Sequence, residues 1–114
     1  MALQLGLDVS QAGPVTVVVV RGELDLASAP DLDRLLRLLS DSGALDVAVD
    51  LGDLAFVDSH GLDVVVAWRE RFAARGGGLQ VRRPGRLARH LLDTMGVARG
   101  IVAPDPAAPR LLTA

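Results

Sequence analysis

Apolar and polar residues alternate along several short stretches of the chain, with the two-residue period of a strand that has one buried face. The pattern predicts strands over residues 3–9, 15–20, 47–51 and 79–82. Residues 15–20 are apolar on both sides, so we expect this strand in the middle of the sheet. Turn residues fill positions 10–14. Because so short a loop joins only antiparallel neighbours, the first two strands should form an antiparallel pair.

Residues 28–43 have the start, the apolar spacing and the end of an amphipathic helix. Ser28 is placed to cap this helix, Pro30 falls in its first turn, and Asp31 completes a box-like arrangement at the third helical position. Ser42 and Gly43 end it. The apolar stripe that we expect to be buried consists of Leu32, Leu35, Leu36 and Leu39.

The same spacing predicts two further helices, one from Ser59 up to the glycines at 76–78 and one over residues 86–95. Residues 101–102 are expected to add a short last strand. The tail from Ala103 contains three prolines, which leave room only for a short helix around residues 110–112. The buried face of the earlier helix is predicted to carry Leu62, Val65, Val66, Phe72 and Ala73, with Trp68 in or near the core, and one side of the later helix to carry Leu87, Leu91 and Met95.

The elements follow the order β-β-α-β-α-β-α-(β) in a single domain over residues 1–114, with a core at about 3–102 and a proline-rich tail at 103–114. Right-handed crossovers through the helices make the second, third and fourth strands parallel. The strands other than the second each have one polar face, so helices should cover mainly one side of the sheet. The predicted fold is an α/β two-layer sandwich with a mixed sheet of four to five strands. Its uncovered face is expected to be polar apart from Val18 and Val20.

Composition excludes several classes of function. The 114 residues include no cysteine, which excludes thiol redox chemistry and Cys-based metal sites, and the two histidines, at 60 and 90, are too few for a zinc site. A net charge of −2 gives no general attraction to nucleic acid or acidic membranes. No apolar run approaches the roughly 20 residues that span a bilayer, and the first residues lack the pattern of a signal peptide. We therefore expect a cytoplasmic protein that needs no cofactor or metal.

Polar residues gather in the loops that follow the parallel strands, where sites form in sheets of this kind. Glu23 and Asp25 follow the second strand, and Asp58, Ser59 and His60 follow the third. The carboxyl ends of neighbouring parallel strands meet at one edge of the sheet, so these two loops should lie side by side. A basic cluster at the start of the last helix is expected to be a solvated helix start, and consists of Arg82, Arg83, Arg86 and Arg89.

Two roles compete for the hydroxyl of Ser59, which lies where an apolar strand gives way to a helix. A serine here is commonly the helix cap. A hydroxyl beside the first free N–H groups of a helix is also suited to accept a phosphate or to act as a nucleophile. Asp58 could take the cap instead and leave Ser59 free. A hydrolase nucleophile turn would require glycine in place of Val57 and an oriented base, and His60 should point away from its neighbour, so we expect no catalytic residues.

Three segments together resemble the sulphate-transporter and anti-sigma-factor-antagonist (STAS) domain family, over about residues 3–102. Gly22-Glu23-Leu24-Asp25 is similar to the family's G-E-L-D signature. Residues 50–62 are similar to its D-S-S-G-L phosphorylation loop and the strand before it, and residues 82–97 to its late arginine-leucine helix. The chain departs from the family pattern at His60, where a second serine or a threonine is usual, and in the proline-rich tail.

The resemblance implies an anti-sigma-factor antagonist, which binds an ATP-using serine-kinase anti-sigma factor. The kinase would phosphorylate Ser59 and end the binding, and a phosphatase would reverse the modification. We expect a monomer that contacts neither nucleic acid nor membrane. Two alternatives stay open: a non-switching STAS subunit of a signalling assembly, and the accessory STAS subunit of a lipid-transport ATPase. The residues then expected to bind the partner are Glu23, Asp25, Asp58, Ser59, His60, Gly61 and Leu62.

Overall fold

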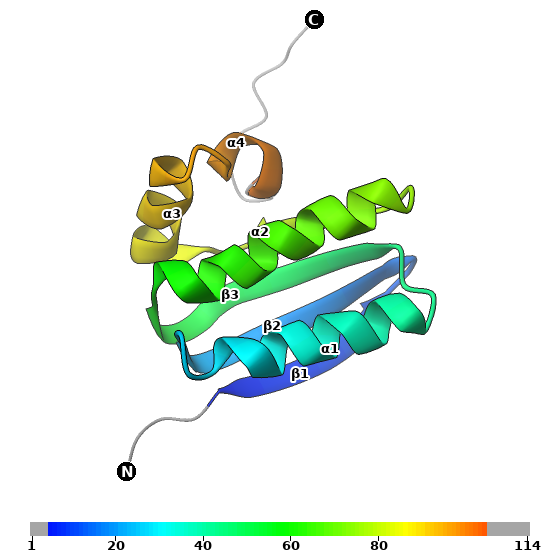
Figure 1. The fold of residues 1–114 in the computed structure, drawn as a ribbon, viewed down its shortest axis with the longest axis horizontal. Coiled ribbons are helices and arrows are strands. Elements are labelled where there is room, and N and C mark those ends of the chain that lie inside the picture. Colours follow the sequence, from blue (N-terminus) through cyan, green and yellow to red (C-terminus); the bar gives the residue numbers. More distant parts are fainter. Residues whose placement is uncertain (1–4, 105–114) are drawn as a thin grey trace, which may run out of the picture.

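A computed structural model describes residues 5–104, which form four strands and four helices (Figure 1). The predictions for Leu3 and for the tail beyond Pro104 lie outside the described residues. Within residues 5–104, no helix is long and apolar enough to cross a membrane. The elements are β1 (Gly6–Ala12), β2 (Val15–Leu24), α1 (Ala29–Asp41), β3 (Asp46–Val57), α2 (Ser59–Ala74), β4 (Gly78–Arg82), α3 (Gly85–Thr94) and α4 (Ala98–Ile101).

The strands form one mixed sheet in the order β1-β2-β3-β4, in which β1 is antiparallel to β2 and the other neighbours are parallel. Helices α1 and α2 lie side by side across one face of this sheet (Figure 1). The predicted α/β fold, the parallel central strands and the inner position of β2 are therefore confirmed.

The core lies between the sheet and these helices, and one sequence prediction about it is wrong. Val18 and Val20 were expected on the uncovered face, but both are fully buried in the core against the helices. Their neighbours Val15, Val17 and Val19 are the half-buried residues of the uncovered face instead. The first helix also differs in detail, because only Leu32 and Leu36 of its stripe are fully buried.

The strands are longer than the hydrophobic pattern indicates. Residues 10–12 were predicted to be a turn, but they pair with β2, and only Gly13 and Pro14 form the turn. Likewise β2 continues to Leu24 and β3 to Val57, with shifts of register between them. Polar residues interrupt the apolar pattern in these extensions, while the pairing between the strands continues.

The last part of the chain also departs from expectation. Residues 101–102 were predicted to be a strand, but Ile101 ends the short helix α4, and Val102 makes only a single parallel bridge to Val81. On α3 the fully buried residues are Ala88 and Leu92, whereas Leu87 is 47% exposed. The face of α3 that packs on the sheet is therefore rotated by one residue from the predicted one.

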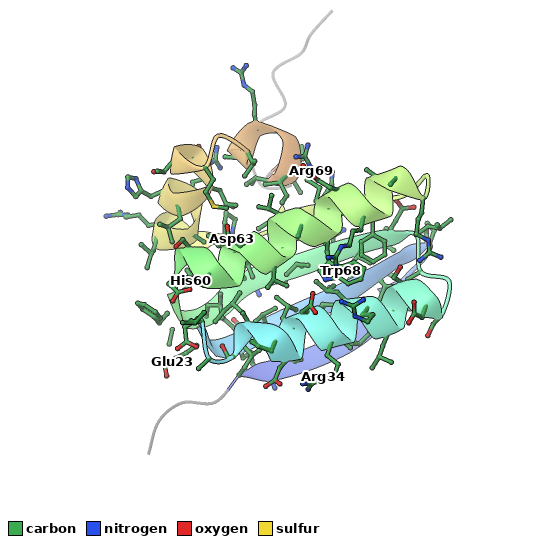
Figure 2. All side chains as sticks on the ribbon, viewed as in Figure 1. Glu23, Arg34, His60, Asp63, Trp68 and Arg69 are labelled. Atoms are coloured by element: carbon green, nitrogen blue, oxygen red, sulfur yellow. The ribbon has the colours of Figure 1, made fainter. Side chains whose placement is uncertain are left out.

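A polar contact joins the two helices of the outer layer. Trp68 of α2 is buried, as predicted, and its Nε1–H donates to Asp33 Oδ1 of α1 at 2.7 Å (Figure 2). The guanidinium of Arg71 lies over the indole ring, 4.6 Å from its centroid. The hydrogen bond from Trp68 is the largest influence on the carboxyl of Asp33 and lowers its pKa.

Ala73, predicted on the buried face of α2, is exposed.

Candidate functional site

The ends of β2 and β3 bring the two polar loops together, as the parallel topology predicts. Glu23 pairs with Phe56 and Leu24 with Val57. The main-chain N–H of Asp58 donates to the carbonyl of Leu24 at 3.1 Å. In Figure 2, Glu23 and His60 lie at the same end of the molecule.

A glycine lets the start of α2 approach the end of β2 very closely. Gly61 is buried, and a Cβ added to it would lie 2.5 Å from the Cγ of Leu24 and 2.7 Å from the carbonyl oxygen of Leu24. These distances are far inside normal contact, so no side chain fits at this position without movement. Gly61 therefore allows the helix that begins at Ser59 to pack directly against the end of β2, where the acidic loop with Glu23 and Asp25 begins.

Asp58 is the N-cap of α2, so the cap is not the role of Ser59. Asp58 has extended backbone, and its Oδ1 accepts the N–H of Gly61 at 3.0 Å. Ser59 is then the first helical residue and is exposed. Within residues 5–104, its hydroxyl makes no side-chain hydrogen bond, so it is available to a reagent from solution.

His60 faces the cap and not the serine hydroxyl. Its Nδ1 lies 3.7 Å from Oδ2 of Asp58, and 57% of its side chain is exposed. Among the described residues, no hydrogen bond joins the imidazole to Ser59, so the pair lacks the contact of a nucleophile with its base. Across the same residues, no group of three His, Cys, Asp or Glu side chains could hold a metal ion.

Asp25 folds the acidic loop, which consists of residues 23–28 and precedes α1. Its Oδ1 accepts the N–H groups of Ala27 and Ser28, each at 3.0 Å. Ser28, predicted to cap α1, makes no side-chain cap bond; its hydroxyl donates to the carbonyl of Glu23 at 2.7 Å and accepts the N–H of Asp25 at 3.0 Å. Ser28 therefore occupies the predicted N-cap position, but its hydroxyl holds the loop to the end of β2 and does not bond to the helix. An aspartate at the start of a loop commonly bonds to the main chain two residues on, and Asp25 was the available signal for this turn.

Not all the residues predicted to bind a partner are at the surface. Leu62 is fully buried and packs in the core, and Gly61 is covered by Leu24. The prediction that these two residues form part of a docking surface is wrong, because this side of α2 faces the sheet. The exposed apolar residues near the serine loop are Leu26, which is 65% exposed, and Phe56, which is 44% exposed. Sequence analysis did not single them out, since an apolar residue near a loop gives no sign of its exposure.

Comparison with known proteins gives a consistent result. Residues 7–104 match a family model described as "Mlab, STAS domain". The chain is 32% identical over 95 residues to the anti-sigma-B factor antagonist of Bacillus subtilis, an alignment that covers 83% of this chain and 86% of the relative.

Solved structures of anti-sigma factor antagonists have the same fold. One from Mycobacterium paratuberculosis is 24% identical and superposes with a TM-score of 0.80, over 90% of this chain and 88% of that one. The anti-sigma factor antagonist SpoIIAA in its unphosphorylated form is 17% identical, with a TM-score of 0.76, over 89% of this chain and 90% of that one. Since the family model spans most of the residues, and a relative above 30% identity is covered for most of its length, this chain belongs to the STAS domain family.

Proposed function

We propose that this protein is an anti-sigma-factor antagonist that acts by binding a serine-kinase anti-sigma factor, and that phosphorylation of Ser59 ends this binding. The sequence similarity to the Bacillus subtilis antagonist supports the class of function. The observation that supports Ser59 as the phosphorylated residue concerns the start of α2. Asp58 supplies the helix cap, and Ser59 is exposed at the first turn of α2, with no side-chain hydrogen bond to any residue of the range 5–104.

The chemistry of the site suits a phosphate acceptor that leaves the fold intact. A phosphate on Ser59 would lie at the N-terminus of a 16-residue helix, where the first N–H groups favour negative charge. It would add a charge of about −1.5 to −2 beside the carboxylate of Asp58. The fold tolerates this charge in water, whereas burial against a partner requires it to lose its hydration. Binding is therefore lost through desolvation and repulsion, without unfolding.

The remaining parts of the proposal follow from this mechanism. The partner is a kinase that uses ATP, a phosphatase resets Ser59, and the reaction takes place in the cytoplasm, where ATP is available. The protein itself contributes an exposed hydroxyl and a binding surface, and no catalysis. Glu23 belongs to this surface, because it lies at the end of β2 beside the strand that leads to Ser59.

The test uses the purified chain as bait in a lysate of the organism that encodes it, with Ser59→Asp as a second bait. We expect the wild type to capture an ATP-binding anti-sigma factor, identified by mass spectrometry, and Ser59→Asp to lose it. The purified kinase and ATP should then add one phosphate, which Ser59→Ala abolishes and Ser42→Ala retains. Ser42 is a suitable control because it is exposed at the far end of α1. Phosphate mapped to Ser28, Ser40 or Ser42 would contradict the proposal.

A second candidate function is the accessory STAS subunit of a lipid-transport ATPase, in which the same surface binds the ATPase and no phosphate is involved. The observation that favours keeping it is the description of the matching family model, which differs from the names of the antagonists. The capture experiment separates the two candidates. A transporter ATPase bound equally by the wild type and Ser59→Asp would support this second candidate.

A further inference from the structure

The last part of β3 has a strand on one side only. β3 runs to Val57, but its pairing with β4 covers only Asp46 to Asp50. The main-chain polar groups of a strand alternate between its two edges, so part of those in residues 53–57 point away from β2. Within the described residues, no strand pairs with them on that side. This stretch, which we call the free edge, leads directly into Asp58 and Ser59.

The free edge arises because β4 is short and ends at Arg82, opposite Asp50 of β3. Arg83, the residue after β4, has a φ of +47°, in the left-handed region outside the extended backbone of a strand. Its guanidinium reaches back to β3, with Nε 3.0 Å from Oδ1 of Asp50 and Nη2 3.7 Å from Oδ1 of Asp53. Asp50 also accepts the N–H of Gly52 at 2.9 Å. The Arg83 side chain therefore covers the edge of β3 at Gly52, and the free edge begins after it.

An open hollow of about 130 Å³ lies alongside the free edge. One wall is β3 from Leu51 to Val57, and the other is the start of α3 with its preceding proline. This volume is close to the roughly 150 Å³ of an engineered apolar cavity that binds benzene, so the hollow has room for one large apolar side chain. Its large exposed apolar residues are Phe56 and Leu87, 44% and 47% exposed.

The charged residue of the hollow is basic. Arg86 lines it and is exposed. Among the described residues, no carboxylate lies within ion-pair distance of Arg86. An acidic residue of a binding partner would therefore find an available cation here, next to an apolar hollow and unpaired main-chain groups.

We propose that the free edge binds an extended, acidic segment of the anti-sigma factor, which adds a short strand to β3 at residues 53–57. An apolar side chain of that segment enters the hollow between Phe56 and Leu87, and an acidic one pairs with Arg86. Such strand addition combines main-chain hydrogen bonds for affinity with side-chain pockets for specificity. The inference rests on the proposed function, since the segment belongs to the protein that binds the surface around Ser59.

The main test is hydrogen exchange of the ¹⁵N-labelled full chain, alone and with the purified anti-sigma factor identified by the capture experiment. The outward amides among residues 53–57 should exchange rapidly in the free chain and at least tenfold more slowly in the complex. Binding without this protection would overturn the inference and leave the proposed function standing, and protection of β1 instead would do the same. Absence of any binding by the folded wild type would overturn both.

Two variants test the side chains independently of the main chain. Leu87→Asp and Arg86→Glu should each weaken binding at least tenfold. Leu38→Asp and Arg99→Glu are matched controls at exposed positions on α1 and α4, and should bind as the wild type does. Unfolding by urea checks that each variant is folded. Wild-type affinity in both Leu87→Asp and Arg86→Glu would overturn the assignment of the hollow.

Discussion

Adding one methyl group at Gly61 should destabilise the whole domain and move the loop after β2 away from the loop after β3, which together form the candidate site. In Gly61→Ala the new Cβ would lie 2.5 Å from Cγ of Leu24 and 2.7 Å from its carbonyl oxygen. Carbon atoms pack best at about 3.5–4.0 Å, so α2 and β2 must move apart by about 1 Å. Leu24 is fully buried and has no space to yield.

The size of the effect follows from three contributions. Overpacking in a filled core costs about 1–3 kcal/mol. The carbonyl of Leu24 also accepts the N–H of Asp58, and loss of this bond removes about a further 1 kcal/mol. Alanine favours a helix over glycine by up to about 1 kcal/mol, which opposes the other two. We expect the free energy of unfolding to fall by about 2 kcal/mol, which lowers the Tm by roughly 8–12 °C for a domain of this size.

Equilibrium unfolding in urea, followed by the fluorescence of Trp68, measures this change. Gly78→Ala is the matched control, because its Cβ would meet only Asp46 Oδ1, at 3.7 Å, an ordinary contact. The control should keep the free energy of unfolding within about 0.5 kcal/mol of the wild type. If Gly61→Ala is as stable as Gly78→Ala, the close approach of α2 to β2 is wrong, and so is the seating of the serine loop derived from it.

The remaining predictions concern charge and backbone strain. Phosphorylation of Ser59 should change the Tm little and weaken partner binding by at least about 2 kcal/mol; global unfolding of the phosphoprotein, seen by circular dichroism, would show a switch by disorder. The hydrogen bond from Trp68 is the main cause of the lowered pKa of Asp33. The stability that ionised Asp33 contributes is therefore present above the pKa of the unfolded state, about 3.9, and is lost as pH falls through the lower pKa of the folded state. Unfolding experiments from pH 6 to pH 2 should therefore show a smaller loss of stability in Asp33→Asn than in the wild type. Arg83→Gly and Arg83→Ala both lose the ion pairs, but glycine accepts the φ of +47°, so Arg83→Gly should be about 1 kcal/mol more stable in urea, and equal stability would argue against strain there.

The parts of the fold that the sequence predicts well are those where neighbouring residues carry the information. Alternation marks the strands, three- and four-residue spacing marks the helices, and the rule for parallel crossovers places the loops after β2 and β3 side by side. The choice between Asp58 and Ser59 as cap needed the structure. Both residue types are good caps, and only the extended backbone of Asp58 and its bond to Gly61 separate them.

The errors occur where contrast is missing or the partner is distant in sequence. β2 is apolar on both faces, so nothing local indicates that Val18 and Val20 face the helices. On α3, Leu87, Leu91 and Met95 are spaced as regularly as Ala88 and Leu92, and the close packing of Ala88 on the sheet decides between them. Ser28 bonds to Glu23 at the end of the previous strand, a contact that helix-start patterns do not include.

The candidate site was predicted only as a set of nearby residues. Glu23, Ser59 and His60 lie at the surface near the ends of two paired strands, as expected. The burial of Leu62, the loop-forming role of Asp25 and the free edge of β3 depend on how far each strand continues. Strand length is a property of the pairing between chain segments, so a pattern within one segment does not contain it.

Leu24 supports the candidate site from within the core, and this affects how the site can bind. Its side chain is fully buried, while its carbonyl holds Asp58 and its atoms define the seat of Gly61. The serine loop is thus preorganised, and a partner need not spend binding free energy on ordering it. We infer that affinity differences among partners should appear in their dissociation rates, while association proceeds at the ordinary rate for two rigid surfaces.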